Sequence, residues 1–93
     1  MNEDALGEAL RALAHPDRRA FVRACTHGER SAGDLAEVST LSLPSVSEHL
    51  KVLRKSGLLV LDRRGRNWMY STDTARLAAV SEAVAALGGP DGT

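Results

Sequence analysis

The sequence predicts a mainly α fold with one small β-hairpin, an α+β arrangement of five helices and two strands. In several short segments, apolar residues recur at i, i+4 and i+7, as on one face of an amphipathic helix. After Gly57 the apolar period changes from 3.6 to 2, which is typical of a strand. The chain has 93 residues, 43% hydrophobic and 26% charged, enough for one globular domain and too few for two.

Two helices are expected in the first part of the chain. The first runs to about Ala14, and His15-Pro16 follows it, because proline disfavours helix in the preceding residue and suits a first helical turn. The second is expected over 16–25. The apolar face of the first helix consists of Leu6, Leu10 and Leu13.

Two shorter helices follow, each opened by a serine. Ser31, with Asp34 three residues later, resembles a capping box, in which the serine side chain satisfies a free backbone N–H of the first turn. Ser42 is expected to cap the helix over 42–56, and Gly57 to end it. The inward face of this second helix consists of Val46, Leu50 and Leu53.

A β-hairpin and a last helix complete the domain, expected over 1–87. Leu59 and Leu61 alternate with other residues, 63–67 is expected to form the turn, and the return strand carries Trp68 and Tyr70 on one face. These aromatic rings are expected to pack in the core or the hairpin rather than to stack on single strands. The last helix begins near 73–74, and 88–93 is expected to be a flexible tail.

Two short helices joined by a tight turn and followed by a hairpin are the order of a winged helix-turn-helix, in which the second helix enters the major groove of DNA and the hairpin is the wing. The formal net charge is zero, but residues 45–66 carry six basic residues against two acids, a net charge of +4. A neutral chain with one basic segment has a face suited to phosphate.

The predicted DNA contacts lie on the 42–56 helix and on the 62–67 wing. Glu48 is repelled by phosphate, although a carboxylate can accept a hydrogen bond from a cytosine amino group. His49 lies on the flank of the apolar face, and both base contact and packing remain open for it. The predicted set is Ser42, Ser45, Ser47, Glu48, His49, Lys51, Arg54, Lys55, Arg63, Arg64 and Arg66.

The first and last helices together carry more apolar surface than so small a chain is expected to cover by itself. An uncovered apolar patch usually marks an interface, so a homodimer is predicted. Its two recognition helices would lie about 34 Å apart and match a two-fold-symmetric operator. The predicted dimer residues are Leu6, Leu10, Leu13, Leu77, Val80, Val84 and Leu87.

The stretches ALRALAHPDRRAFV, GDLAEVSTLSLPSVSEHLKVLRKSGLL and DRRGRNWMYS resemble the arsenic-repressor (ArsR) family of bacterial winged-helix regulators. The resemblance covers about 6–87, and LPSVSEHLKVLRKSGLL is its most specific part. It implies a homodimer held by the first and last helices that represses a promoter, often that of its own gene, until an inducer binds. Glu48 departs from the basic residue or histidine common in the family.

The chain also departs from the two best-known metal patterns of that family. Where the thiolate sensors carry Cys-x-Cys, it has Ser31-Ala32-Gly33, and where the others carry Asp-x-His it has Asp73-Thr74-Ala75 with no later histidine. No metal and no other cofactor is therefore expected from these patterns. Cys25 and His27 offer only two ligands, so a metal or redox role for Cys25 stays open beside that of a buried thiol.

Other classes of function have little support. No nucleophile lies in a recognisable elbow or triad motif and no glycine-rich phosphate loop is present, so an enzyme is not expected. The acidic residues among the first eight and the lack of a long apolar run do not fit a secretory signal, and a cytoplasmic protein is expected. The alternative left open is a winged-helix module that binds protein and has weak or no DNA binding.

Overall fold

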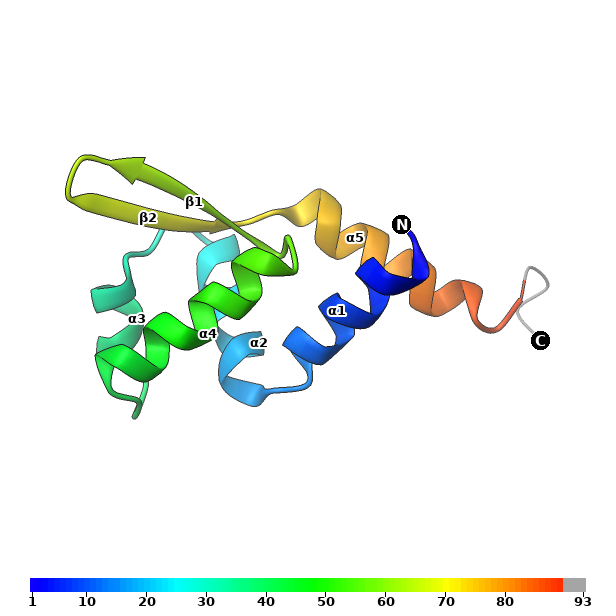
Figure 1. Cartoon of the computed structure of the whole chain (residues 1–93), viewed down its shortest axis with the longest axis horizontal. Helices are drawn as coiled ribbons and strands as arrows, with labels where there is room; N and C mark the ends of the chain where they lie inside the picture. The colour runs from blue at the N-terminus through cyan, green and yellow to red at the C-terminus, as the bar shows by residue number, and fades with distance from the viewer. Residues whose placement is uncertain (90–93) are drawn as a thin grey trace.

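The computed structural model of the chain describes residues 1–89, so 90–93 of the predicted tail lie outside the described residues. Five helices and one antiparallel hairpin are present, which confirms the predicted fold class (Figure 1). Among the described residues, no helix combines the length and the apolar character needed to cross a membrane. The elements are α1 Glu3–Leu13, α2 Pro16–Thr26, α3 Ala32–Glu37, α4 Leu43–Lys55, β1 Leu59–Arg64, β2 Asn67–Thr72 and α5 Thr74–Ala86.

The helix starts follow from side chains that accept hydrogen bonds from backbone N–H groups of the first turn. Ser31 and Asp34 form the predicted capping box, with Asp34 N 3.0 Å from Ser31 Oγ and Ser31 N 2.9 Å from an Asp34 carboxylate oxygen. Ser42 caps α4 as predicted, and Asp73 caps α5. The first helix begins at Glu3 because the Asn2 side chain accepts from Ala5 N at 2.7 Å.

The hairpin is tighter than the sequence suggested. Arg64 pairs with Asn67, so the turn contains only Gly65 and Arg66, and the prediction of a turn over 63–67 is wrong at both ends. Gly65 has φ +60°, which suits the left-handed backbone of a two-residue turn. Beyond the hairpin, Arg30 exchanges two backbone hydrogen bonds with Tyr70, at 3.0 and 2.8 Å, and so ties the α2–α3 loop to β2.

The core lies where the helices meet the base of the hairpin. Val46, Leu50 and Leu53 of α4 are fully buried, as predicted. Each fully buried leucine contributes roughly 1.5–3 kcal/mol relative to an exposed one, so these side chains fix which face of α4 remains outside. The other buried apolar residues are Leu6, Ala9, Ala12, Phe21, Val22, Cys25, Leu35, Leu58, Leu59, Tyr70 and Val80.

Two of the predicted dimer residues therefore belong to the core of a single chain. Leu6 is 5% exposed and Val80 is 4% exposed, because α1 and α5 pack against each other. Helical period alone assigned Val80 to the same stripe as Leu87, which is 75% exposed. The stripe on α5 thus divides into a part that faces α1 and a part that faces solvent.

Candidate nucleic-acid interface

The outer face of α4 is polar and open to solvent. It lies opposite the buried Val46, Leu50 and Leu53, so α4 cannot turn this face inward without losing its packing. The exposed polar residues of the helix are Ser45, Ser47, Glu48, Lys51, Arg54 and Lys55. Ser45, Glu48, Lys51 and Lys55 therefore project away from the core.

The N-terminal end of α4 combines two hydroxyls with the positive end of the helix dipole. Ser42 Oγ accepts a hydrogen bond from Ser45 N at 3.4 Å and donates one to Ser45 Oγ at 3.1 Å. Both serines are exposed. The partial positive charge of a helix N-terminus favours an anion, so this end of α4 is suited to contact a phosphate.

The C-terminal half of α4 supplies the positive charge. Lys51, Arg54 and Lys55, together with Leu59, line an open cavity of about 300 Å³ between α4 and the start of the hairpin. Lys51 Nζ lies 3.8 Å from Glu48 Oε1, with both side chains 75% exposed. A pair so exposed is worth about 0–1 kcal/mol, so Glu48 does not prevent Lys51 from binding another anion.

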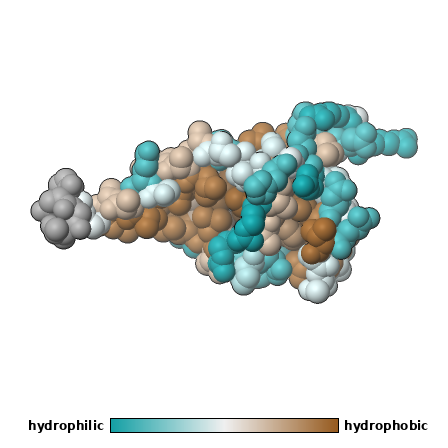
Figure 2. All heavy atoms as spheres, turned by 180° about the vertical axis from the view of Figure 1, so that it is seen from behind, coloured by the Kyte–Doolittle hydropathy of each residue, from teal (hydrophilic) through white to brown (hydrophobic). Residues whose placement is uncertain are grey.

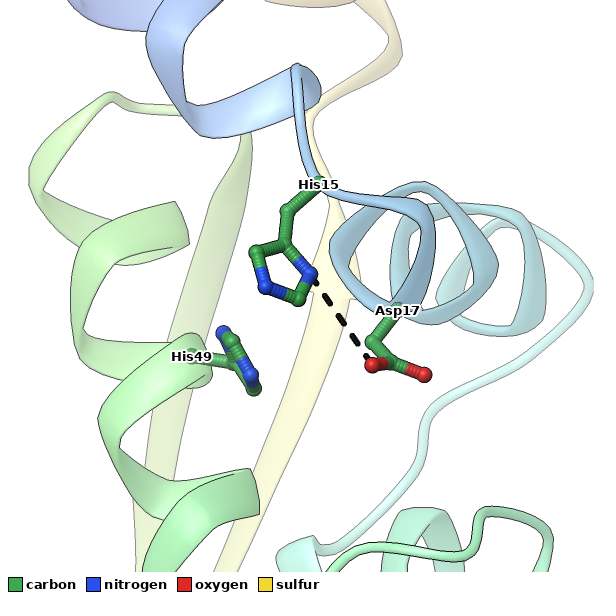
Figure 3. A group of neighbouring side chains, drawn as sticks. All are labelled: His15, Asp17 and His49. Carbon is green, nitrogen blue, oxygen red and sulfur yellow. Dashed lines mark ion pairs between the residues drawn. The ribbon is translucent and has the colours of Figure 1, made fainter.

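His49 faces the protein, which decides the alternative that the sequence left open. Its Nδ1 accepts a hydrogen bond from Arg18 Nε at 3.0 Å, and its ring lies 6.3 Å from that of Phe21. The His49 ring also lies 4.6 Å from that of His15 (Figure 3). Burial, followed by the nearby His15 and Arg18, lowers the pKa of His49. In the described structure His49 therefore packs against α2 and is not part of the outer face of α4.

The wing has one arginine that is already paired. Arg64 donates hydrogen bonds from Nε to Asp62 at 2.7 Å and from Nη2 to Glu29 at 2.6 Å. These bonds raise the pKa of Arg64, and its side chain remains 54% exposed. Glu29 lies in the α2–α3 loop, so the ion pair joins the wing to the body of the molecule. The positive charge of Arg64 is therefore largely balanced by these two carboxylates.

The other two wing arginines are placed differently. The guanidinium carbon of Arg63 lies 4.6 Å from the centre of the Trp68 ring, a cation–π contact that leaves its positive charge uncompensated. Trp68 is 45% exposed and thus belongs to the wing surface, whereas Tyr70 is buried in the core. Arg66 is exposed in the turn, and within residues 1–89 no hydrogen bond or ion pair of its side chain is found.

The wing tip and the N-terminal end of α4 lie at the same end of the molecule, whereas the basic half of α4 lies beside the start of the hairpin. In Figure 1 the wing tip and the N-terminal end of α4 both point to the left, while the C-terminal end of α5 points to the right. The α2–α3 loop supports the wing there, through the Arg30–Tyr70 bridge and the Glu29–Arg64 ion pair. A single extended ligand could contact both elements.

One face of the opposite half of the molecule is largely apolar. Figure 2 shows hydrophobic atoms gathered over the half that contains α1 and α5. Leu10 is 41%, Val84 43% and Leu87 75% exposed there. Leu13 and Leu77 are partly buried and line a cavity of about 380 Å³ beside α2. Of the seven predicted dimer residues, these five keep exposed surface.

Cys25 lies in the core at the end of α2, 3% exposed. Burial raises the pKa of its thiol to about 11, with Arg30 opposing the shift. A thiol with so high a pKa holds almost no thiolate at neutral pH, and the thiolate is the form that binds metals and reacts with oxidants. His27, its predicted neighbour in a two-ligand site, is exposed at the C-terminal end of α2.

Three contacts that shape this surface were not predicted from the sequence. Arg18 holds His49 across 31 positions, and Glu29 holds Arg64 across 35. Trp68 supports Arg63 from the neighbouring strand. Such partners become visible only when the fold brings distant segments together.

Comparison with known proteins agrees with this geometry. Residues 13–62 match the family described as "Helix-turn-helix domain". The chain is 40% identical over 86 residues to the HTH-type transcriptional repressor SmtB of Mycobacterium tuberculosis, covering 91% of this chain and 64% of that protein. It thus spans less than two thirds of that repressor. It is also 32% identical over 72 residues to the transcriptional repressor SdpR of Bacillus subtilis, covering 77% of this chain and 80% of SdpR.

Solved structures give the same answer for the fold. The crystal structure of an ArsR family transcriptional regulator superposes with a TM-score of 0.82 at 27% sequence identity, covering 91% of this chain and 88% of that one. Taken with the sequence relatives, this match shows that the chain belongs to the ArsR family of winged helix-turn-helix transcriptional regulators.

Proposed function

We propose that the chain is a homodimeric repressor that binds a two-fold-symmetric DNA operator in the cytoplasm and represses its own promoter. The observation that carries this proposal is the outer face of α4, which the buried Leu50 and Leu53 hold outward with its basic residues exposed. Relatives named as repressors support the direction of regulation. The role is that of a binding protein and not of an enzyme.

In this proposal α4 enters the major groove and the wing tip contacts the backbone or the minor groove. Ser42 and Ser45 are placed to contact phosphate, while Glu48 reaches a base edge and the basic residues neutralise the flanking backbone. His49 is left out because it packs on α2, and Arg64 is left out because two carboxylates hold it. The proposed contacts are Ser42, Ser45, Ser47, Glu48, Lys51, Arg54, Lys55, Arg63 and Arg66.

The dimer is proposed to form through the exposed apolar surface of α1 and α5. Leu10, Val84 and Leu87 stay exposed in one chain, and a second copy would cover them. A two-fold interface places the same patch on both subunits, so each chain supplies both halves of the contact. The arrangement leaves α4 and the wing of each subunit free for one half of the operator.

Direct binding and subunit association test the two parts separately. We expect the purified chain to bind a duplex from upstream of its own gene, with log affinity falling steeply as log salt rises, because several phosphates are contacted. Absence of binding even at low ionic strength would favour the alternative, a protein-binding module. The exposed Glu48 and the internally paired Arg64 are the observations that keep this alternative under test.

The association test compares two variants of similar exposure. Val84 is 43% exposed on α5 and Val60 is 49% exposed on the wing. We expect sedimentation velocity to show that Val84→Glu is monomeric and that Val60→Glu remains a dimer. A monomeric wild type at micromolar concentration, or a Val84→Glu variant that still dimerises as well as Val60→Glu, would refute this interface.

A further inference from the structure

A group of three possible metal ligands lies between α2 and α4, away from the outer face of α4. Within residues 1–89 this is the one group of three or more such side chains, and it consists of His15, Asp17 and His49. One ligand atom of each residue lies within 4.8 Å of those of the other two. Figure 3 shows the three side chains pointing toward one another, His15 and Asp17 from the start of α2 and His49 from the middle of α4.

The donor set has the chemistry of a transition-metal site. Imidazole nitrogens with one carboxylate oxygen suit Zn²⁺, Co²⁺ and Ni²⁺ rather than Ca²⁺ or Mg²⁺, which prefer oxygen ligands alone. The side chains of His15 and Asp17 are 46% and 39% exposed, so water has access to complete the coordination. A three-ligand site with an open position is a common arrangement for zinc.

The ligands can reach bonding distance by small side-chain movements. Metal–nitrogen distances of about 2.0–2.1 Å in a tetrahedral site imply ligand atoms roughly 3.4 Å apart. His15 precedes α2 and makes no capping hydrogen bond with its side chain. Its Nδ1 lies 3.9 Å from an Asp17 carboxylate oxygen, a weak pair that a cation between them would replace. Little of the present structure therefore holds His15 and Asp17 in place.

One contact opposes metal binding and makes the idea testable. Arg18 Nε donates to His49 Nδ1, which occupies a lone pair of that imidazole. If the metal binds Nδ1, Arg18 must leave that atom. If the metal binds Nε2, the ring proton must lie on Nδ1, so Nδ1 can no longer accept a hydrogen bond from Arg18. Metal binding and the Arg18–His49 hydrogen bond are thus mutually exclusive.

We propose that His15, Asp17 and His49 form a binding site for a divalent transition-metal ion of the zinc, cobalt or nickel type, which ties the start of α2 to the middle of α4. The metal replaces the Arg18–His49 hydrogen bond as the link between these helices. Because His49 belongs to α4, the site connects metal binding to the placement of that helix. This connection to DNA rests on the proposed function, whereas the site itself does not.

The test titrates the metal-free full chain with Co²⁺, followed by its visible d–d absorption, and with Zn²⁺ by calorimetry. We expect one ion per chain and a Co²⁺ spectrum without a sulfur charge-transfer band. His15→Ala and Asp17→Asn, which alter half-exposed side chains, should each weaken binding more than the roughly 10–100-fold typical of losing an outer-shell partner. No binding by the wild type, or unchanged binding by both variants, would overturn the site.

Matched controls use the other possible ligands of the chain. His27 is the one remaining histidine and Cys25 the one cysteine, so His27→Ala and Cys25→Ala should bind Co²⁺ as the wild type does. Arg18→Met keeps the aliphatic stem and removes the competing donor, so it should bind Co²⁺ more tightly. Weaker binding by Arg18→Met, or loss of binding by His27→Ala, would contradict the assigned ligands.

The link to DNA has its own readout. If Zn²⁺ changes the affinity for the upstream duplex, the duplex must change the affinity for Zn²⁺ by the same factor, and His15→Ala must abolish both effects. Equal duplex binding with and without Zn²⁺ would overturn the link to DNA. The metal site itself would still be decided by the Co²⁺ titration. Failure of the duplex to bind at all would refute the proposed function instead.

Discussion

Arg64 and Arg66 lie on either side of Gly65, yet the structure gives them different roles in DNA binding. Arg64 is held by Asp62 and Glu29, whereas Arg66 is exposed at the tip of the wing. We therefore expect replacement of Arg66 to remove a phosphate contact and replacement of the Arg64 ion pair to remove none. From the sequence alone, both arginines are predicted to contact DNA.

The magnitude follows from counterion release. Each phosphate contact contributes about 0.9 to the slope of log affinity against log salt, and a dimer carries two wings, so Arg66→Ala should flatten the slope by about 1.8. Between about 50 and about 200 mM salt, the wild type should then lose about 12-fold more affinity than the variant does. The change should be the same for specific and unrelated duplexes, since phosphates carry no sequence information.

The matched control is the double variant Arg64→Ala/Glu29→Gln, which removes one charge of each sign and keeps the net charge of the chain. Its slope should equal that of the wild type. Fluorescence anisotropy of a labelled upstream duplex over a salt series measures both slopes. A wild-type salt slope for Arg66→Ala would show that the wing tip does not contact the DNA backbone. A salt slope of the double variant reduced as much as that of Arg66→Ala would show that Arg64 leaves its carboxylates to bind phosphate.

Three further predictions concern stability. Leu53→Ala should destabilise the chain by about 2–5 kcal/mol in urea unfolding, because Leu53 is fully buried, whereas Glu48→Ala on the outer face should change stability by about 0.5 kcal/mol or less. Ser31→Ala should cost about 1 kcal/mol in the same assay, because it removes one half of the capping box of α3. Between pH 9 and 11 the native chain keeps a Cys25 proton that the unfolded chain loses, so the free energy of unfolding should fall by up to about 2.7 kcal/mol as pH rises. Cys25→Ala should lack this alkaline component.

Each of these has a result that would contradict it. Equal stabilities of Leu53→Ala and Glu48→Ala would mean that α4 packs through another face. A Ser31→Ala variant as stable as the wild type would mean that the cap of α3 is not formed in solution. Parallel pH profiles of the wild type and Cys25→Ala between pH 9 and 11 would mean that the thiol is not shielded from water in the native state.

Much of the fold could be predicted because its signals are local. The two residues of the capping box, Ser31 and Asp34, are three positions apart, and the stripe of Val46, Leu50 and Leu53 spans two turns of one helix. Within such distances the covalent chain fixes which side chains meet, so spacing and residue type determine the geometry. The sequence by itself therefore determined the order of the elements and the outward face of α4.

The tertiary structure alone decided how exposed residues of the same type differ from one another. It placed Glu29 against Arg64 and Arg18 against His49, over 35 and 31 positions, and so separated the paired Arg64 from the exposed Arg66 and turned His49 inward. It also assigned Leu6 and Val80 to the core while it left Leu87 exposed. The physical reason is that charge pairing and burial depend on distances between segments, and these distances are set by packing and not by any spacing along the chain.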